Sequence, residues 1–371
     1  MEARVQRGCF LSFLCVLMPM YGYAIEHNNV VATMNVGVNP AGIAITPDNR
    51  FAYVANNNNY TLAGADTVSV LDLKNNTVKK TITDSSFNEP YTITINASGT
   101  KAYVTNSNST TITIIDIASN TVAGIIDGFD GPSGMVITLD GSRAYVNNYG
   151  GPEGVGSGNA ITVRVVDLIN NTIIGDPIVV GLAPAALAIT PDGTFVYVAN
   201  YVNGNPGAGT MSVIQTSNNA VVGNITGFSG PFAIAITPNG KYAYVTNFGS
   251  NNFAPIGSTV SVVKLSTNTI VATINLAIQP AGIAITPNGK HAYVTNYNTL
   301  YAGSNFTDLT AGQGTVNIID IETNQVIPPT IAVGQSPVNI AITPNGRFAY
   351  VTNYTSNTVN VIALPSHHRE G

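Results

Sequence analysis

The chain repeats one four-residue motif, Tyr-Val-x-Asn with Thr, Ala or Asn at x, seven times. The copies begin at Tyr53, Tyr103, Tyr145, Tyr197, Tyr244, Tyr293 and Tyr350. Consecutive copies lie about 50 residues apart. A repeat of this length, built from short β-patterned segments, is typical of the blades of a β-propeller. The motif therefore constrains the chain to an array of similar units.

Within each repeat, four short apolar segments alternate with turn signals, which predicts four β-strands per unit. In the first repeat these segments run over residues 43–46, 51–56, 67–73 and 77–82. The turn after the first segment reads Thr-Pro-Asn-Gly, or a close variant, in most repeats. Proline presets φ at the second turn position and glycine accepts a left-handed conformation, so this sequence favours a tight hairpin.

The two ends of the chain complement each other. The last repeat supplies three strands, from Pro337 to Leu364, and then stops. Residues 30–36 closely match residues 271–275, which form an internal outer strand. We therefore predict that residues 28–36 pair with the last blade and close the ring, which removes unpaired strand edges. The predicted fold is all-β, a seven-bladed β-propeller with four antiparallel strands per blade, the last blade built as three strands plus one.

The predicted domain organisation is a signal peptide over residues 1–24 and a single propeller over residues 25–371. Its blades are expected at approximately residues 40–83, 90–127, 132–181, 184–226, 231–275, 280–334 and 337–364, the last completed by 28–36.

The first 24 residues have the organisation of a signal peptide. Arg4 and Arg7 precede an apolar stretch from Cys9 to Met20, and Gly22-Tyr23-Ala24 offers small residues at the cleavage positions. This stretch is too short to span a bilayer. We expect cleavage after Ala24 and export to the periplasm, the cell surface or the medium. A retained membrane anchor is the alternative, and a lipoprotein modified at Cys15 is disfavoured because bulky Leu14 stands where a small residue is expected.

The composition excludes several classes of site. Both cysteines, Cys9 and Cys15, lie in the predicted signal peptide, so the mature chain has no disulfide or thiolate metal site. Cleavage changes the formal net charge from −5 to −6, and only 9% of residues are charged. Without a basic run longer than Lys79-Lys80, the surface offers no electrostatic footprint for nucleic acid. We expect a monomer with no nucleic-acid partner and no membrane span in the mature chain.

The repeat carries a family resemblance. The Tyr-Val-Thr-Asn signature, the preceding Pro-x-x-Ile-Ala-Ile-Thr-Pro-(Asp/Asn)-Gly sequence and the spacing resemble the YVTN-family β-propeller repeat proteins. The resemblance covers nearly the whole mature chain, with departures at residues 95–99 and 137–141, which lack the proline. It implies a seven-bladed propeller, exported as a bacterial or archaeal surface or envelope protein. It does not imply one activity, because members of the family differ in function and fold alone does not determine function.

Groups suited to catalysis are few. His27 adjoins the predicted cleavage site, His367 and His368 lie in the carboxyl-terminal tail, and His291 occupies a position where other repeats carry Phe or Tyr. Such a position indicates packing, and no second histidine is placed to join His291 in a metal site. We expect no catalytic residue set, no cofactor and no metal site.

The repeated and loop residues have structural explanations. Asp72, Asp116, Asp167 and Asp320 recur at the end of the third strand, where aspartate caps a turn. The Gly-rich residues 150–158 lack the lysine and the helix of a phosphate loop. No calcium-loop pattern is present, although Asp66, Glu153 and Asp308 leave an adventitious ion site open.

The variable part of the repeat is the connection after the second strand, at residues 57–66, 107–110, 149–160, 201–209, 248–258, 297–314 and 354–357. Strand direction places all of these loops around one mouth of the central channel. The candidate ligand-binding residues are the loop aromatics Tyr149, Tyr201, Phe248, Phe253, Tyr297, Tyr301, Phe306 and Tyr354. Aromatic rings among Asn, Gly and Ser are typical of binding loops. Packing of each ring under its own loop is the alternative.

Three functional hypotheses follow. The first is a non-enzymatic, exported scaffold or binding module for a protein, peptide or glycan, using loops 149–160, 201–209, 248–258 and 297–314. The second is a periplasmic enzyme or redox-partner propeller, similar to lactonases or quinoprotein subunits, although the isolated histidine and the lack of converging charges oppose it. The third, an envelope DNA-binding propeller, is opposed by the net charge. A shared aromatic pocket would favour the first hypothesis, and a deep polar channel with clustered acids the second.

Overall fold

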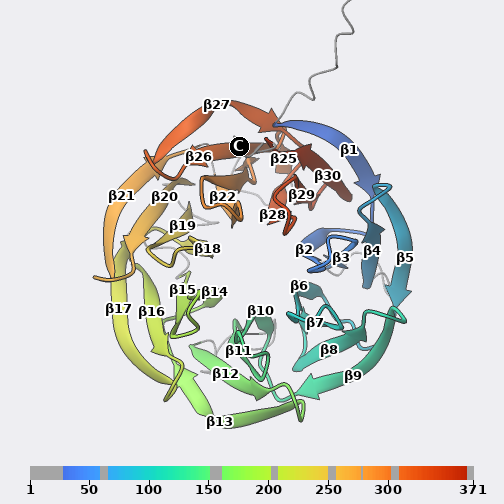
Figure 1. The fold of residues 1–371 in the computed structure, drawn as a ribbon, viewed down its shortest axis with the longest axis vertical. Helices are drawn as coiled ribbons and strands as arrows, with labels where there is room; N and C mark the ends of the chain where they lie inside the picture. The colour runs from blue at the N-terminus through green and yellow to red at the C-terminus, as the bar shows by residue number, and fades with distance from the viewer. Residues whose placement is uncertain are drawn as a thin grey trace, which may run out of the picture.

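The structure is a computed structural model that describes residues 28–58, 66–150, 161–201, 208–249, 256–276, 279–301 and 309–365. Seven four-stranded antiparallel sheets surround a central axis as the blades of a propeller (Figure 1). Over the described ranges the regular structure consists entirely of strands. The predicted fold class is confirmed.

Each blade runs from an inner strand beside the axis to an outer strand at the rim (Figure 1). The first three blades are β2 (Pro40–Ile45), β3 (Phe51–Asn56), β4 (Thr67–Asp72) and β5 (Thr77–Thr83); β6 (Pro90–Ile95), β7 (Lys101–Asn106), β8 (Thr111–Asp116) and β9 (Thr121–Asp127); and β10 (Pro132–Ile137), β11 (Arg143–Asn148), β12 (Thr162–Asp167) and β13 (Thr172–Val179).

The next three blades follow the same order. They are β14 (Pro184–Ile189), β15 (Phe195–Asn200), β16 (Gly209–Gln215) and β17 (Ala220–Phe228); β18 (Pro231–Ile236), β19 (Tyr242–Gly249), β20 (Ile256–Lys264) and β21 (Thr269–Asn275); and β22 (Pro280–Ile285), β23 (His291–Asn296), β26 (Thr315–Asp320) and β27 (Gln325–Ala332).

The seventh blade joins the two ends of the chain. Its strands are β28 (Pro337–Ile342), β29 (Phe348–Asn353), β30 (Thr358–Ala363) and, at the rim, β1 (Asn29–Asn35). In Figure 1, β1 in blue lies beside β30 in dark red. The antiparallel ladder runs from Asn29 opposite Ala363 to Asn35 opposite Thr358, and Met34 is buried beneath it. This pairing leaves the ring without a gap between its first and last strands.

The signature tyrosine connects neighbouring blades. All seven signature tyrosines are at most 2% exposed. Six of their hydroxyls donate to the amide oxygen of an asparagine in the following blade: Tyr53 to Asn120, Tyr145 to Asn219, Tyr197 to Asn268, Tyr244 to Asn324, Tyr293 to Asn28 and Tyr350 to Asn76, over 2.5 to 3.0 Å. Because a buried hydroxyl without a partner is costly, the motif specifies the docking of one blade on the next.

The signature asparagine acts inside its own blade. In the fourth blade Asn200 is fully buried, and its Nδ2 donates to Thr210 Oγ1 at 2.9 Å and Ser212 Oγ at 3.0 Å on β16. Equivalent bonds link Asn56 to Thr67 and Asn247 to Thr259. These bonds anchor the point where each second strand ends and its variable loop begins.

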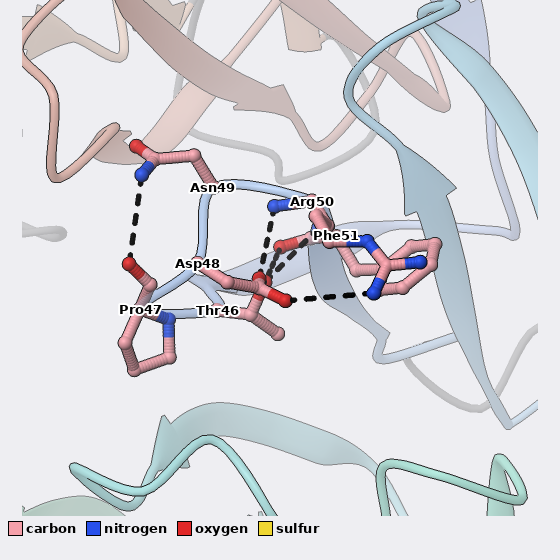
Figure 2. A network of polar contacts seen from close by, with 6 residues as sticks. All are labelled: Thr46, Pro47, Asp48, Asn49, Arg50 and Phe51. Carbon is pink, nitrogen blue, oxygen red and sulfur yellow. Dashed lines mark hydrogen bonds and ion pairs between the residues drawn. The ribbon is translucent and has the colours of Figure 1, made fainter.

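The turn after the first strand is held by its own side chains, as Figure 2 shows for residues 46–51. Thr46 Oγ1 donates to Asp48 Oδ1 at 2.5 Å, and the backbone N–H of Phe51 donates to Thr46 Oγ1 at 3.0 Å. Asn49 takes the left-handed position, with φ of 60°, that glycine fills in other blades. The same Thr-to-Asp or Thr-to-Asn bond recurs at Thr190, Thr237, Thr286 and Thr343. This end of each blade is therefore a uniform structural element.

The predicted capping role of the repeated aspartates is also confirmed. Backbone N–H groups donate to Oδ1 of the aspartate two or three residues earlier: Lys74 to Asp72, Ser119 to Asp116, Ile169 to Asp167 and Thr323 to Asp320, over 2.8 to 2.9 Å. Bonds of this kind lower the pKa of the Asp116 and Asp320 carboxyls, because they stabilise the ionised form.

One predicted loop contains additional structure. Residues 297–314 were expected to form a loop, whereas the chain there forms two short antiparallel strands, β24 (Thr299–Tyr301) and β25 (Leu309–Ala311). Their sequences, Thr-Leu-Tyr and Leu-Thr-Ala, contain the β-branched and aromatic residues that strands favour.

Candidate functional site

All seven blades present one side chain in the same way at the channel mouth. This side chain belongs to the residue that follows the signature asparagine. Its backbone N–H donates to the carbonyl of the residue before the inner-strand proline: Asn57 to Asn39, Ser107 to Glu89, Tyr149 to Gly131, Tyr201 to Ala183, Phe248 to Gly230, Tyr297 to Gln279 and Tyr354 to Ser336, over 2.9 to 3.0 Å. The seven side chains are therefore placed equivalently around the propeller axis.

The residues that accept these bonds share an unusual backbone conformation. Asn39, Glu89, Gly131, Ala183, Gly230, Gln279 and Ser336 all have φ between 50° and 60°. This left-handed region is unfavourable for most side chains, and five of these residues are not glycine. The turn into each inner strand, at the end of the ring that carries the variable loops, is thus strained in most blades.

Five of the predicted ligand-binding residues lie together. Tyr149, Tyr201, Phe248, Tyr297 and Tyr354 line one cavity of about 240 Å³. Its remaining lining residues are Asn57, Tyr91, Phe232, Ala281 and Val338. We call this cavity the mouth pocket. Because every blade contributes at least one of these ten residues, the mouth pocket lies on the propeller axis.

The rings pack on one another across blades. Phe248 lies between Tyr201 of the preceding blade, at 6.4 Å between ring centroids, and Tyr297 of the following blade, at 5.8 Å. Phe232 is 5.1 Å from Phe248 and 6.2 Å from Tyr201. Tyr201 and Phe248 are buried, whereas Tyr149 is 40% exposed at the edge of the mouth pocket. Tyr201, Phe232, Phe248 and Tyr297 form one shared cluster. The alternative in which each ring packs only under its own loop therefore does not describe these four side chains.

Two pocket residues are missing from the sequence prediction. Tyr91 and Phe232 directly follow Pro90 and Pro231, at the second position of an inner strand. The other blades carry smaller residues there: Ala41, Ser133, Ala185, Ala281 and Val338. The sequence does contain a signal for this position, because its side chain varies from Ala to Tyr while the following Ile-Ala-Ile or related pattern is maintained.

A smaller cavity continues from the mouth pocket into the channel. It has a volume of about 170 Å³, is lined by inner-strand residues of all seven blades, and shares Tyr91, Phe232 and Val338 with the mouth pocket. Every residue that lines it is uncharged. This is not the deep polar channel with clustered acids that would favour an enzyme.

Burial controls the ionisation of the mouth tyrosines. It raises the pKa of Tyr91, Tyr149 and Tyr354, and the neighbouring phenols raise the pKa of Tyr91 and Tyr354 further. The Glu89 carboxylate also raises the pKa of Tyr354. The phenols therefore stay protonated and neutral at physiological pH, and they can donate and accept hydrogen bonds. One such bond joins Tyr354 to Asn57 Oδ1 at 3.4 Å.

The two ends of the ring carry different charges. Among the described residues, no lysine or arginine lies in a connection at the mouth end. The described connections there contain the acids Asp66, Asp84, Glu89, Asp127 and Asp130. The opposite end, which we call the turn end, carries basic residues at Arg50, Lys74, Lys101, Arg143, Lys241, Lys264, Lys290 and Arg347. Its acids are Asp48, Asp72, Asp116, Asp140, Asp167, Asp192, Asp320 and Glu322, so the turn end is balanced.

Several predicted features lie outside the described residues. These are the signal peptide at residues 1–24, the rings of Phe253 and Phe306, and the side chain of Tyr301. Within the part of the chain that is described, no three His, Cys, Asp or Glu residues form a group that could hold a metal ion. A helix long and apolar enough to cross a membrane is also absent from the described ranges.

Comparison with known proteins supports the fold. Residues 24–124 match the family model of the lactonases, described as a 7-bladed beta-propeller. The seven-bladed beta-propeller protein Rv1057 of Mycobacterium tuberculosis is 37% identical over 112 residues, which are 29% of this chain and 26% of that protein. The PE-PGRS family protein PE_PGRS18 of the same organism is 45% identical over 58 residues, which are 16% of this chain and 12% of that protein.

Among solved structures, hydrazine synthase of Kuenenia stuttgartiensis superposes with a TM-score of 0.72. The alignment covers 89% of this chain and 97% of that chain at 20% identity. At this identity the likeness shows the fold alone. The matches span only 26% of Rv1057 and 12% of PE_PGRS18. They show homology to one seven-bladed propeller protein, Rv1057, without assigning an activity.

Proposed function

We propose that this protein is a non-enzymatic, exported β-propeller of the YVTN type that binds a protein, peptide or glycan at the mouth pocket. One observation carries the proposal: seven aromatic rings from six blades converge on one axial cavity. Concave, mostly apolar sites with a few polar groups are the usual form of a binding site. The cavity is bordered by Tyr hydroxyls and the Asn57 amide, which can orient a bound group by hydrogen bonds.

The repeat architecture supports this assignment of roles. The signature tyrosine donates hydrogen bonds between blades, whereas the signature asparagine and the turn-end residues form hydrogen bonds within a blade. The aromatics of the mouth pocket are additional to these bonds. Rigid scaffolds that carry function on their loops commonly divide roles in this manner.

Glycan and peptide arrays probed with the full chain test the proposal. The informative variant combines Tyr91→Ala and Phe232→Ala, because alanine already stands at the equivalent position in three other blades. Val222→Ala, at an exposed site on β17, is the matched control. We expect the wild type and the control to bind the same compounds and the double variant to bind them at least about tenfold more weakly. Array binding that the double variant retains in full would contradict the proposal.

Export is a separate part of the proposal, supported by the composition of residues 1–24. Amino-terminal sequencing of native protein from cell fractions tests it. We expect a mature start near Ile25 in a fraction outside the cytoplasm. Native protein that begins at Met1 in the cytoplasm would contradict it.

A second candidate function is that of an enzymatic propeller, favoured by the match of residues 24–124 to the lactonase model. A panel of lactones distinguishes the binding proposal from the enzyme proposal. Hydrolysis is assayed by base consumption at constant pH, with and without added divalent metal ions. The binding proposal predicts no turnover above buffer. Turnover that requires residues of the axial channel would favour the enzyme.

A further inference from the structure

The charge distribution and the lining of the mouth pocket point to one class of ligand. The pocket is lined by seven aromatic rings and no cationic side chain. The connections around it carry acids without lysine or arginine, whereas the turn end carries both signs. The faces of aromatic rings are negative, so the rings and the surrounding carboxylates favour the same sign of ligand charge.

Two acidic residues, Glu89 and Asp66, lie in the connections near the pocket, outside its lining. Glu89 directly precedes Pro90 and Tyr91, and its negative charge acts on the hydroxyl of Tyr354, which the seventh blade presents at the pocket. The Asp66 carboxylate is partly buried, which raises its pKa, and it accepts a hydrogen bond from the backbone N–H of Glu89. A cation in the pocket would therefore interact with rings on several sides and with these carboxylates at the rim.

The shape of the ring cluster limits the kind of cation. Tyr201 and Phe232 meet at 76°, Phe248 and Tyr297 at 61°, so the rings form walls rather than one flat platform for stacking a sugar. A metal ion needs several oxygen ligands, and a primary ammonium needs acceptors for its three N–H groups. A methylated ammonium needs neither, because its charge is spread over methyl groups that are favourably buried against aromatic carbon.

We propose that the mouth pocket seats a methylated ammonium group, an inference that rests on the binding role proposed above. The group belongs either to a free small molecule of the choline type or to a trimethylated lysine side chain of a peptide. Both present the same trimethylammonium head, and a cavity of about 240 Å³ accommodates it.

The test compares a cation with its neutral shape mimic. The full chain is titrated calorimetrically with choline and with 3,3-dimethyl-1-butanol, in which a carbon atom replaces the charged nitrogen. We expect choline to bind at least about tenfold more tightly than the alcohol, because only choline gains the interaction of a cation with the rings. Equal binding of the two compounds, or no binding of choline, overturns the cation proposal.

Three sets of variants test whether choline binds in the mouth pocket. Glu89→Gln removes one rim charge without changing the pocket lining, and it should weaken choline binding several-fold while leaving the alcohol unchanged. Glu322→Gln, at the turn end, is the matched control and should change neither. The Tyr91→Ala, Phe232→Ala double variant should lose choline binding. If that variant unfolds, Tyr149→Ala replaces it, because Tyr149 is the most exposed ring and its loss affects packing least.

A third comparison separates the two sources of the ligand. A short peptide with trimethyl-lysine is titrated beside the same peptide with unmodified lysine. Tighter binding of the trimethylated peptide than of choline identifies a macromolecular ligand, and the reverse identifies a small molecule. If both cations fail while an array compound still requires Tyr91 and Phe232, the binding role stands and the cation inference alone is wrong. If no compound depends on these residues, both are wrong.

Discussion

The two ends of the ring are built from the same repeat, yet they vary in different ways. At the turn end the Thr-to-Asp or Thr-to-Asn bond recurs in six blades, and the aspartate cap recurs in four. At the mouth end the backbone anchors are equally regular, but the side chains they present range from Ser107 to Tyr354. Uniform side chains therefore mark where the fold is made, and variable side chains on a uniform backbone mark where we propose that a ligand is recognised.

The contrast is sharpest between two tyrosines four residues apart. Tyr145 is fully buried, and its hydroxyl donates to Asn219 Oδ1 of the next blade at 2.6 Å. Tyr149 is 40% exposed and lines the mouth pocket. The Tyr145 side chain connects two blades, and the Tyr149 side chain borders the cavity. The same residue type thus serves the scaffold or the site according to the end of the strand at which it lies.

Removal of β1 should have the largest effect, because it opens the scaffold itself. A chain that begins at residue 38 loses the ladder to β30, the burial of Met34 and the acceptor Asn28 of Tyr293. Ladder bonds contribute about 0.5–1.5 kcal/mol each and a buried side chain about 1.5–3 kcal/mol, so the sum is comparable with the stability of an ordinary domain. We expect a sharply lower melting temperature or association through the exposed edge of β30.

The control for this truncation is removal of the tail from Ser366. Thermal melts and gel filtration of both truncated chains decide the outcome. Two equally harmless truncations would contradict the role of β1 in ring closure.

Alkaline pH should unfold the scaffold next. Burial raises the pKa of Tyr53, Tyr197, Tyr244 and Tyr350 to about 12. Because the unfolded chain ionises its tyrosines near pH 10, the stability that these residues contribute is complete below about pH 10 and is lost as the pH rises towards 12. Absorbance of tyrosinate and circular dichroism, recorded together, should show that these phenols ionise only as the ring unfolds. Complete ionisation near pH 10 with the fold intact would contradict their burial.

Removing one tyrosine hydroxyl at a time should have a smaller effect on stability, and this effect should differ between signature tyrosines and mouth tyrosines. Tyr145→Phe leaves the Asn219 amide oxygen without its inter-blade donor, which should lower the free energy of unfolding by about 1–3 kcal/mol. Tyr149→Phe removes a hydroxyl at the exposed rim and should change stability by less than about 0.5 kcal/mol. Urea denaturation measures both. Similar losses in the two variants would remove the distinction between scaffold and mouth tyrosines.

The smallest expected effect concerns backbone strain at the mouth end. Ala183 has φ of 53°, and two equivalent positions carry glycine. Ala183→Gly should raise the free energy of unfolding by a few tenths to about 1 kcal/mol, because glycine accepts the left-handed region without steric cost. Ala188→Gly, inside β14, is the control and should lower it by about 0.5–1 kcal/mol. A loss of stability in Ala183→Gly would show that this turn is not strained.

Much of the fold is predictable because it repeats. The motif spacing predicts the blades, and the match between residues 30–36 and 271–275 predicts the partner of β30. The inter-blade bonds of the signature tyrosines are not predictable in this way. Tyr197 and its acceptor Asn268 lie 71 residues apart, and only the assembled ring brings them together.

The candidate site is predictable in part for the same reason. Position after the signature asparagine identifies Tyr149, Tyr201 and the other loop aromatics as mouth residues. It does not identify Tyr91 and Phe232, because the residue after an inner-strand proline has the pattern of an ordinary strand residue. Contact between aromatic side chains of different blades depends on the radius of the propeller, which no single repeat encodes.

The central claim is that ligand binds at the mouth end and the turn end serves only the scaffold. Hydroxyl-radical footprinting, with oxidation quantified at each tyrosine by mass spectrometry, tests it most directly. The full chain is compared alone and saturated with the compound that binds best in the arrays. We predict lower oxidation at Tyr149, Tyr297 and Tyr354, and unchanged oxidation at the signature tyrosines. Protection confined to turn-end residues, or unchanged oxidation at all three mouth tyrosines in the saturated protein, would contradict the account.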